Sequence, residues 1–303
     1  MPQYATRAAR RKPQNAPDAV DTRAVSGGRL YVVATPIGNL DDLSPRAARV
    51  LAEVDLVAAE DTRRTGRLLA HAGISAEQVS LHEHNEEQAT ARLLAELGAG
   101  RTVALVSDAG TPLVSDPGYR LLAGAHAAGV PVSPVPGPSA LLAALSVAGL
   151  PTDRFCFEGF LPSKAAARRS RLAELAAETR TLVFFASVHR IADTLADLAA
   201  AFGAGRRAFV GRELSKLHEQ CVAATAGELA AMAADGRLPA KGEFVVVCAG
   251  APQAATGTLD VDELLRRLAP LLPHRQAVEI AAAASGRRRN ELYRRLLELT
   301  GGD

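Results

Sequence analysis

The feature that most constrains this chain is a short apolar run that ends abruptly in a polar, turn-forming loop. In residues 102–112, the run 103–106 is typical of a buried strand, and S-D-A-G-T-P at 107–112 supplies side-chain oxygens, a glycine and a proline. In a parallel sheet the carboxyl ends of the strands are where ligands bind. The loop is therefore a candidate ligand cradle, and a plain strand-to-helix turn is the alternative for this stretch alone.

The same pattern recurs through residues 30–150. Strands are predicted at 30–34, 56–59, 79–81 and 130–135, and the loops that follow them begin at 35, 60, 82 and 136. Ser44 followed by Pro45 predicts the start of a helix, and Asp61 or Thr62 is a possible helix cap within the charged loop 60–65. Strands that alternate with helices indicate βαβ units and a mostly parallel sheet. A metal site at His82 and His84 is disfavoured, because the two side chains would point to opposite faces of a strand.

The second half predicts another α/β unit with a smaller sheet. We expect strands at 181–185, 208–211 and 244–248, the last of them central, and a helix at 191–202. Residues 151–162 are interpreted as a connection between domains. Arg168, Arg169 and Arg171 are expected on a solvated helix face, or beside a cleft where they could meet phosphates.

A chain of 303 residues is too long for one typical core. The predicted organisation is a disordered basic tail at 1–29, α/β domains at 30–150 and 151–250, a linker at 251–260 and a helical extension at 261–303. The extension resembles a helix-turn-helix with its turn near Ser285 and Gly286, and its arginines would suit a nucleic acid. A small helical cap with a charged outside is the alternative.

Composition narrows the class of protein. The formal net charge is only +2, so any surface for nucleic acid must be local. The three cysteines show no metal or redox spacing, and the sequence has neither a long apolar run nor a secretory leader. A cytoplasmic protein without a membrane span or a metal site is expected.

Seven motifs, in order, resemble one family. They are A-T-P-I-G-N-L-D-D at 34–42, A-E-D-T-R at 59–63, V-S-D-A-G-T-P at 106–112, D-P-G at 116–118, P-G-P-S-A at 136–140, G-L-P at 149–151 and F-L-P at 160–162. The chain is similar to the 16S rRNA (cytidine-2'-O)-methyltransferases of the tetrapyrrole-methylase-like superfamily. The resemblance implies two α/β domains with the ligand cleft between them, S-adenosylmethionine as cofactor, and a homodimer. It also implies methyl transfer to the ribose 2'-hydroxyl of a cytidine in the decoding region, with 16S rRNA or the small ribosomal subunit as partner.

The resemblance also implies which residues form the site. The expected cofactor-binding residues are Ser107, Asp108, Ala109, Gly110, Thr111, Pro136, Gly137, Ser139 and Ala140. The expected substrate-binding residues are Thr35, Pro36, Asn39, Arg63, Arg64, Arg212 and Lys216. One position departs from the pattern: Ala186 stands where relatives typically carry Glu.

The chemistry of the reaction suggests which groups act. A ribose hydroxyl is a poor nucleophile, so a positioned base should help, and Glu60 or Asp61 is the preferred candidate. Asp108 is expected to serve the cofactor instead. One competing hypothesis is a methyltransferase of the same fold that acts on a small molecule such as a tetrapyrrole precursor. A second is a non-catalytic RNA-binding assembly factor, which only Ala186 supports.

Overall fold

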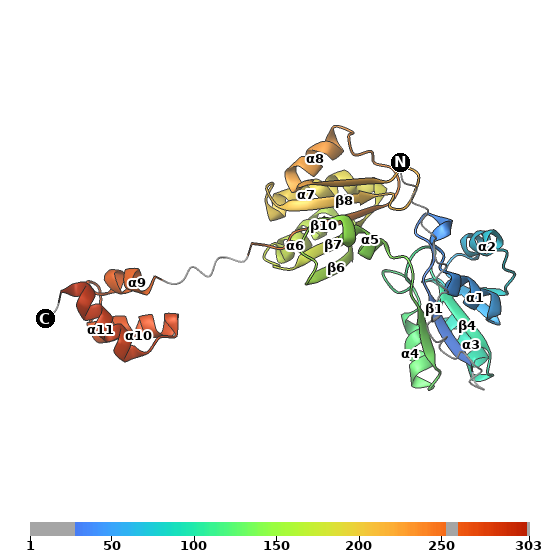
Figure 1. Ribbon diagram of the computed structural model, residues 1–303, viewed down its shortest axis with the longest axis horizontal. Helices are drawn as coiled ribbons and strands as arrows, with labels where there is room; N and C mark the ends of the chain where they lie inside the picture. The colour runs from blue at the N-terminus through green and yellow to red at the C-terminus, as the bar shows by residue number, and fades with distance from the viewer. Residues whose placement is uncertain (1–27, 253–259, 302–303) are drawn as a thin grey trace, which may run out of the picture. The chain divides into compact units, whose positions relative to one another are not determined.

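A computed structural model describes residues 28–252 and 260–301 of the chain and shows two α/β units and a C-terminal group of helices (Figure 1). Most of the predicted basic tail and of the predicted linker lies outside the described residues. The first sheet and its helices consist of β1 (Arg29–Val33), η1 (Leu40–Asp42), α1 (Pro45–Glu53), β2 (Leu56–Ala59), α2 (Thr62–His71), β3 (Gln78–Ser80), α3 (Glu86–Gly98), β4 (Thr102–Val106), α4 (Tyr119–Ala127), β5 (Val132–Val135) and α5 (Ala140–Val147).

The first sheet has the strand order β3-β2-β4-β1-β5, and its strands pair in parallel, as predicted. On one face, α1 and α2 bury apolar side chains such as Leu51 and Leu69 against the strands. On the other face, α3 and α4 bury Leu93 and Leu121. Fully burying a leucine contributes about 1.5–3 kcal/mol, so these two clusters hold the sheet between two helical layers.

Helix starts in this unit follow the capping signals in the sequence. The Ser44 hydroxyl accepts a hydrogen bond from the backbone N–H of Ala47 at 3.0 Å, and Pro45 is the first residue of α1, as predicted. Asp61 caps α2 by accepting a hydrogen bond from the N–H of Arg63 at 2.8 Å. Both loops therefore leave the sheet in a defined direction.

Two segments from later in the chain belong to the first unit. By contacts, this unit comprises residues up to Val147 together with Gly211–Cys221 and Gly242–Val245. The second unit comprises Ala148–Val210, Val222–Lys241 and the residues from Val246 onward. The first unit is thus built from three separate stretches of sequence.

The second sheet has five strands in the order β6-β7-β10-β8-β9, so the prediction of a smaller sheet was wrong. Its elements are β6 (Phe155–Phe160), α6 (Ala165–Leu175), β7 (Thr181–Ala186), η2 (Val188–Arg190), α7 (Ile191–Phe202), β8 (Arg207–Arg212), β9 (Gln220–Thr225), α8 (Ala226–Ala234) and β10 (Phe244–Cys248). All five residues of β10 are buried, and this strand is central, as predicted.

Two predictions in this half need correction. Residues 151–162 contain the edge strand β6 and are not simply a connection between domains. The sequence did not indicate this strand, because it has no fully buried residue and its register shifts between Phe157 and Gly159. Arg168 does not lie on a solvated face. It is 3% exposed, because its Nε donates a 2.7 Å hydrogen bond to Asp197 of α7.

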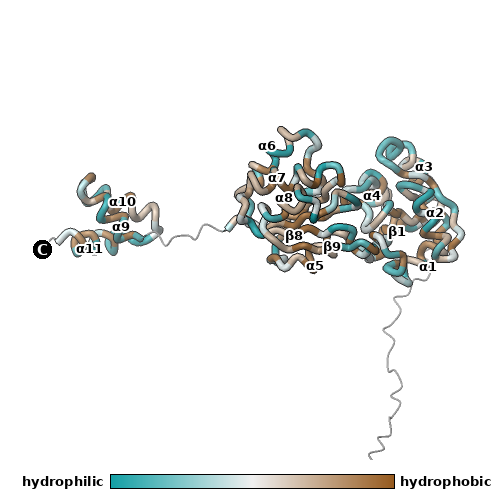
Figure 2. Tube along the Cα trace, turned by 90° about the horizontal axis from the view of Figure 1, so that it is seen from above, coloured by the Kyte–Doolittle hydropathy of each residue, from teal (hydrophilic) through white to brown (hydrophobic). Residues whose placement is uncertain are grey.

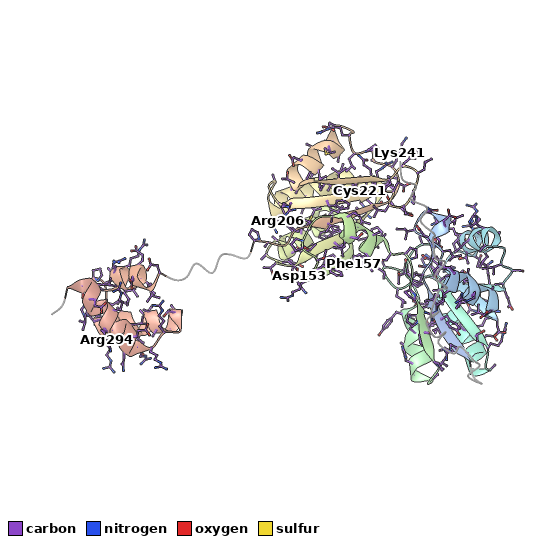
Figure 3. All side chains as sticks on the ribbon, viewed as in Figure 1. Asp153, Phe157, Arg206, Cys221, Lys241 and Arg294 are labelled. Carbon is purple, nitrogen blue, oxygen red and sulfur yellow. The ribbon has the colours of Figure 1, made fainter. Side chains whose placement is uncertain are left out.

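The C-terminal helices α9 (Val261–Leu268), α10 (His274–Ser285) and α11 (Arg289–Thr300) share an apolar core that includes Leu265 and Leu292. Gly286 ends α10 in the left-handed conformation at φ 68°, which confirms the predicted turn. Arginines such as Arg294 lie on the exposed side of α11 (Figure 3). Figure 2 shows how hydrophilic and hydrophobic segments alternate along these helices and through the two α/β units.

Candidate active site

The carboxyl-terminal edge of the first sheet gathers most of the predicted site residues. Because the strands are parallel, the loops after β1, β2, β4 and β5 leave from the same edge. Strands β1 and β4 are neighbours, and the helices that follow them, α1 and α4, cover opposite faces of the sheet. This arrangement is a topological switch point, where ligands bind in open α/β sheets.

The loops after β1 and β4 are joined by a short antiparallel bridge. The N–H of Thr35 donates to the carbonyl of Gly110 at 2.8 Å, and the N–H of Gly110 donates to the carbonyl of Thr35 at 3.0 Å. Thr35 is 2% exposed and Pro36 is also buried. Because both side chains are buried, these two residues support the loops of the site and are not exposed to a substrate.

The connection between β4 and α4 bends through left-handed backbone conformations. Gly110 and Gly118 have φ values of 81° and 121°, which suit glycine. Leu113 and Ser115 also have positive φ, 74° and 72°, and such residues cost about 1–3 kcal/mol each. Nothing in the sequence marks these two residues as unusual. Strain that the surrounding structure holds in place clusters at functional sites, which favours a ligand at this loop.

Two glycines let the backbones of three loops approach one another. A Cβ at Gly137 would lie 3.1 Å from the Cβ of Ala34, and a Cβ at Gly110 would lie 3.3 Å from the Cγ2 of Ile37. The Thr111 hydroxyl donates to the carbonyl of Pro138 at 3.1 Å. The loops after β1, β4 and β5 therefore form a cradle of backbone groups. Ala109, in the loop after β4, is exposed. Helix α5 begins at Ala140, directly after Ser139 in the loop that follows β5.

Three acidic residues interlock at the ends of β2 and β4. The carboxylate of Glu60 accepts a hydrogen bond from the N–H of Asp108 at 3.1 Å, and the carboxylate of Asp108 accepts one from the N–H of Asp61 at 3.0 Å. Arg64 lies 3.2 Å from the second carboxylate oxygen of Asp108. The predicted catalytic residues and one predicted cofactor residue are thus brought together.

The surroundings shift the pKa values of Glu60 and Asp61 in opposite directions. Burial raises the pKa of Glu60, and the negative charge of Asp108 adds to this effect. Hydrogen bonds from the side chain and the backbone of Arg63 lower the pKa of Asp61 well below its ordinary value. Asp61 is therefore committed to capping α2 and pairing with Arg63, whereas Glu60 is better suited to accept a proton.

Asp116 belongs to the same acidic group, although it was not among the predicted site residues. Its pKa is raised to about 6, mainly by burial and also by the negative charges of Glu60 and Asp108, while a hydrogen bond from Ser107 opposes the shift. The only signal in the sequence was its place in the D-P-G motif. Carboxyl groups with shifted pKa values that lie together are candidates for function.

The segment Gly211–Cys221 supports the first loop. Ser215 has a left-handed backbone, with φ 66°. Its hydroxyl accepts a hydrogen bond from the N–H of Asn39 at 3.1 Å and donates one to the carboxylate of Asp42 at 2.9 Å. Ser215 was not predicted as a site residue, and it fixes the loop that carries the predicted residue Asn39.

Lys216 is held against the same loop. Its ammonium group lies 2.8 Å from a carboxylate oxygen of Glu213 and 3.0 Å from one of Glu243. Its aliphatic chain covers Gly38, where a Cβ would overlap the Cγ of the lysine. Arg212, the other predicted substrate residue of this segment, donates to the carbonyl of His218 at 3.2 Å.

Arg63 and Arg64 are strongly exposed, with 86% and 62% of their side chains open to solvent. Exposed guanidinium groups at this edge of the sheet can contact the phosphates of a nucleic-acid backbone. Among residues 28–252 and 260–301, no group of three or more His, Cys, Asp or Glu side chains could hold a metal ion. No helix in the described part of the chain is long and apolar enough to cross a membrane.

Comparison with known proteins supports a methyltransferase. Residues 29–230 match the family model of tetrapyrrole (corrin/porphyrin) methylases, and residues 255–300 match the model of the RsmI C-terminal HTH domain. The chain is 51% identical over 267 residues to ribosomal RNA small subunit methyltransferase I of Xylella fastidiosa (strain Temecula1), covering 88% of this chain and 98% of that protein. It is also 51% identical over 281 residues to the protein of the same name from Pseudomonas aeruginosa, covering 91% and 99%.

A solved structure shares the fold. Uroporphyrin-III C-methyltransferase from Thermus thermophilus, crystallised with S-adenyl homocysteine, matches with a TM-score of 0.51 and 25% identity. The match covers 73% of this chain and 97% of that protein.

Proposed function

Because this chain belongs to the family of ribosomal RNA small subunit methyltransferase I, and to the tetrapyrrole methylases, we propose that it methylates 16S ribosomal RNA with S-adenosylmethionine as cofactor. The proposed acceptor is the ribose 2'-hydroxyl of a cytidine in the decoding region. That finer assignment rests on the motifs that the chain shares with the cytidine-2'-O-methyltransferases. The observation that carries the proposal is the interlocked group Glu60, Asp61 and Asp108 beside the cradle of Gly110 and Gly137.

The residues of this edge fit the cofactor. The missing side chains at Gly110 and Gly137 let the loops after β1, β4 and β5 pack closely, so the backbone groups of these loops lie together at one edge of the sheet. The acidic group of Glu60, Asp108 and Asp116 suits a molecule that carries a sulfonium and an amino group. We propose that the cofactor is held by Ser107, Asp108, Ala109, Gly110, Thr111, Pro136, Gly137, Ser139 and Ala140.

When bound, S-adenosylmethionine supplies an electrophilic methyl group. The chain must then align the acceptor hydroxyl and take its proton. We assign the role of general base to Glu60. Asp61 is less suited to that role, because its carboxylate accepts hydrogen bonds from the N–H and the guanidinium group of Arg63. The N–H of Asp108 orients the carboxylate of Glu60 through their 3.1 Å hydrogen bond.

The RNA would be met by exposed cations around this edge. Arg63 and Arg64 are proposed to contact phosphates. Asn39, which Ser215 holds in place, presents a polar side chain on the first loop. Lys216 and Arg212 support or extend this surface from the segment Gly211–Cys221. We also propose a cytoplasmic location, where the small subunit is found, and a homodimer.

The test is methyl transfer by the purified chain. Small subunits from a strain that lacks this gene are incubated with S-adenosylmethionine, and 2'-O-methyl groups are mapped along their RNA. One cytidine of the decoding region should gain a methyl group that the deletion strain lacks. Methylation of a tetrapyrrole precursor without methylation of subunits would support the small-molecule alternative. Absence of cofactor binding by calorimetry would support a non-catalytic assembly factor.

A further inference from the structure

A pocket lies at the carboxyl ends of β6 and β7 in the second unit, and the proposed reaction does not use it. It is lined by Phe160, Leu161, Pro162, Arg168, Phe185, Ala186, Ser187, Arg190 and Thr194. Arg168 and Arg190 are the charged residues in this lining, and both are cationic. A pocket lined by two guanidinium groups and no carboxylate is suited to an anion.

Arg168 is a buried cation that is only partly paired. Its side chain is 4% exposed, its Nε donates to Asp197 at 2.7 Å, and its Nη2 lies 3.8 Å from Asp193. Among the described residues, Nε makes the one hydrogen bond of this guanidinium group. A guanidinium group has five N–H donors, so Arg168 can donate further hydrogen bonds to a ligand. The charge of Arg168 already has a partner in Asp197, so a ligand would use the remaining N–H donors of the guanidinium group.

Arg190 and the start of α7 add to the positive character of the pocket. The half-buried side chain of Arg190 makes no hydrogen bond or ion pair within the described part of the chain. The first turn of α7 is not capped by a side chain, and the hydroxyl of Ser187 makes no capping hydrogen bond. Asp193 in the first turn of α7 offsets part of the positive helix end, so an anion would be met mainly by Arg190, by the remaining N–H groups of Arg168 and by the hydroxyls of Ser187 and Thr194.

The size of the pocket and its aromatic rim indicate what kind of anion it takes. The pocket is small and open to solvent at its mouth, so a bound phosphate would lie at the mouth and the rest of a nucleotide would extend outside it. Phe160 is 55% exposed at the rim, and its ring is braced edge-to-face by Phe185 at 5.5 Å. An exposed aromatic ring beside cations is typical of surfaces on which an unpaired base stacks.

We propose that this pocket binds one phosphate of an unpaired stretch of the RNA substrate, with an adjoining base stacked on Phe160. The proposal rests on the proposed function, since it names a contact of the same RNA. Ala186 is the last residue of β7 and lines the pocket. A carboxylate there would repel a phosphate, so the alanine leaves the pocket open to one.

The first experiment measures RNA affinity as a function of salt. The full chain is titrated into a fluorescent single-stranded RNA of about 10 nucleotides, a length in the range of single-strand sites. Arg190→Gln should weaken binding about tenfold, because a charge-assisted phosphate contact is lost. The slope of log K against log salt should fall by about 0.7, as expected for one phosphate contact.

The matched control is Arg169→Gln. Arg169 is in α6 next to Arg168, its side chain is 62% exposed, and it does not line the pocket. This control removes one positive charge from the same helix and should change both the affinity and the slope much less. Equal effects of the two substitutions would mean that only net charge matters, and the proposal would fail.

A second pair of variants separates charge from volume. Ala186→Glu and Ala186→Gln add similar volume, but only glutamate adds a negative charge at the pocket. Glutamate should weaken RNA binding at least several-fold more than glutamine does. Phe160→Ala should weaken it about tenfold, in keeping with the loss of one stacked base.

Cofactor affinity and activity distinguish the possible failures. Arg190→Gln and Phe160→Ala should leave the calorimetric affinity for S-adenosylmethionine unchanged and raise the KM for small subunits more than they lower kcat. A loss of cofactor affinity with unchanged RNA affinity would assign the pocket to the cofactor and overturn the proposal. If the wild-type chain methylates subunits but the variants bind and react normally, the pocket proposal alone is refuted. If the wild type does not methylate subunits, the proposed function is refuted.

Discussion

Replacing Asp116 with Asn should stabilise the protein at neutral pH and leave its stability at low pH almost unchanged. Burial and the charges of Glu60 and Asp108 raise the pKa of Asp116 to about 6 from its ordinary value of 3.8. A difference of about 2 units corresponds to at most about 3 kcal/mol. Because Asp116 is only half-buried, solvent screening reduces the expected effect to about 1–2 kcal/mol.

The sign follows from the two pKa values. The folded chain binds the proton of Asp116 more tightly than the unfolded chain does, so protonation favours folding. This contribution is fully present below about pH 4, and it is lost as the pH rises toward about 6. Asparagine cannot ionise, and its side-chain oxygen can still accept the hydrogen bond from Ser107. The variant therefore avoids the cost that the wild type carries above pH 6.

Urea unfolding at constant temperature measures the effect. At pH 7.5 the free energy of unfolding of Asp116→Asn should exceed that of the wild type by about 1–2 kcal/mol, and near pH 4.5 the difference should fall below about 1 kcal/mol. Asp41→Asn is the matched control, because Asp41 is exposed in the same unit. A difference that does not change with pH, or a variant that is less stable at pH 7.5, would refute the reasoning. Under the proposed function the same substitution weakens cofactor binding, since the site loses a negative charge.

Further substitutions test the acidic group and the loop that supports it. Glu60→Gln should slow single-turnover methyl transfer at saturating cofactor about 10²–10⁴-fold, and a full rate would refute its role as base. Asp61→Ala should keep most of the transfer rate but lower the urea midpoint, because α2 loses its side-chain cap. A rate loss equal to that of Glu60→Gln would instead indicate that Asp61 takes part in the reaction. Gly38→Ala should displace Lys216 and lower the free energy of unfolding by about 1 kcal/mol, and a variant as stable as the wild type would show that the lysine is free to move.

The strands and loops that form the site could be predicted, because the strand and turn signals in the sequence agree with the geometry of a parallel sheet. The apolar runs 56–59 and 103–106 were long enough for strands, and both became strands of the first sheet. Since parallel strands end at one edge, the loops after them had to meet. The hydrogen bonds between Glu60, Asp61 and Asp108 follow from that meeting.

The rest depended on contacts between residues far apart in sequence. Arg168 was expected in solvent because its partner Asp197 lies on another helix, which the local pattern of α6 cannot reveal. The strand β6 is an edge strand without a fully buried face, so its alternation was weak. The left-handed conformations of Leu113 and Ser115 are imposed by the fold, because their side chains do not favour them.

The first unit is built from separate stretches of sequence, and this affects the order in which its parts can fold during synthesis. The strands of its sheet are all encoded before Val147, but Gly211–Cys221 leaves the ribosome only after β6, β7 and most of β8 of the second sheet. Domains fold during synthesis from the amino terminus, so the first sheet forms while Asn39 and Asp42 still lack the hydroxyl of Ser215. The loop that carries Asn39 is therefore completed late in translation. A nascent chain arrested before Ser215 should hold the sheet but leave this loop open to protease, which makes the order of events measurable.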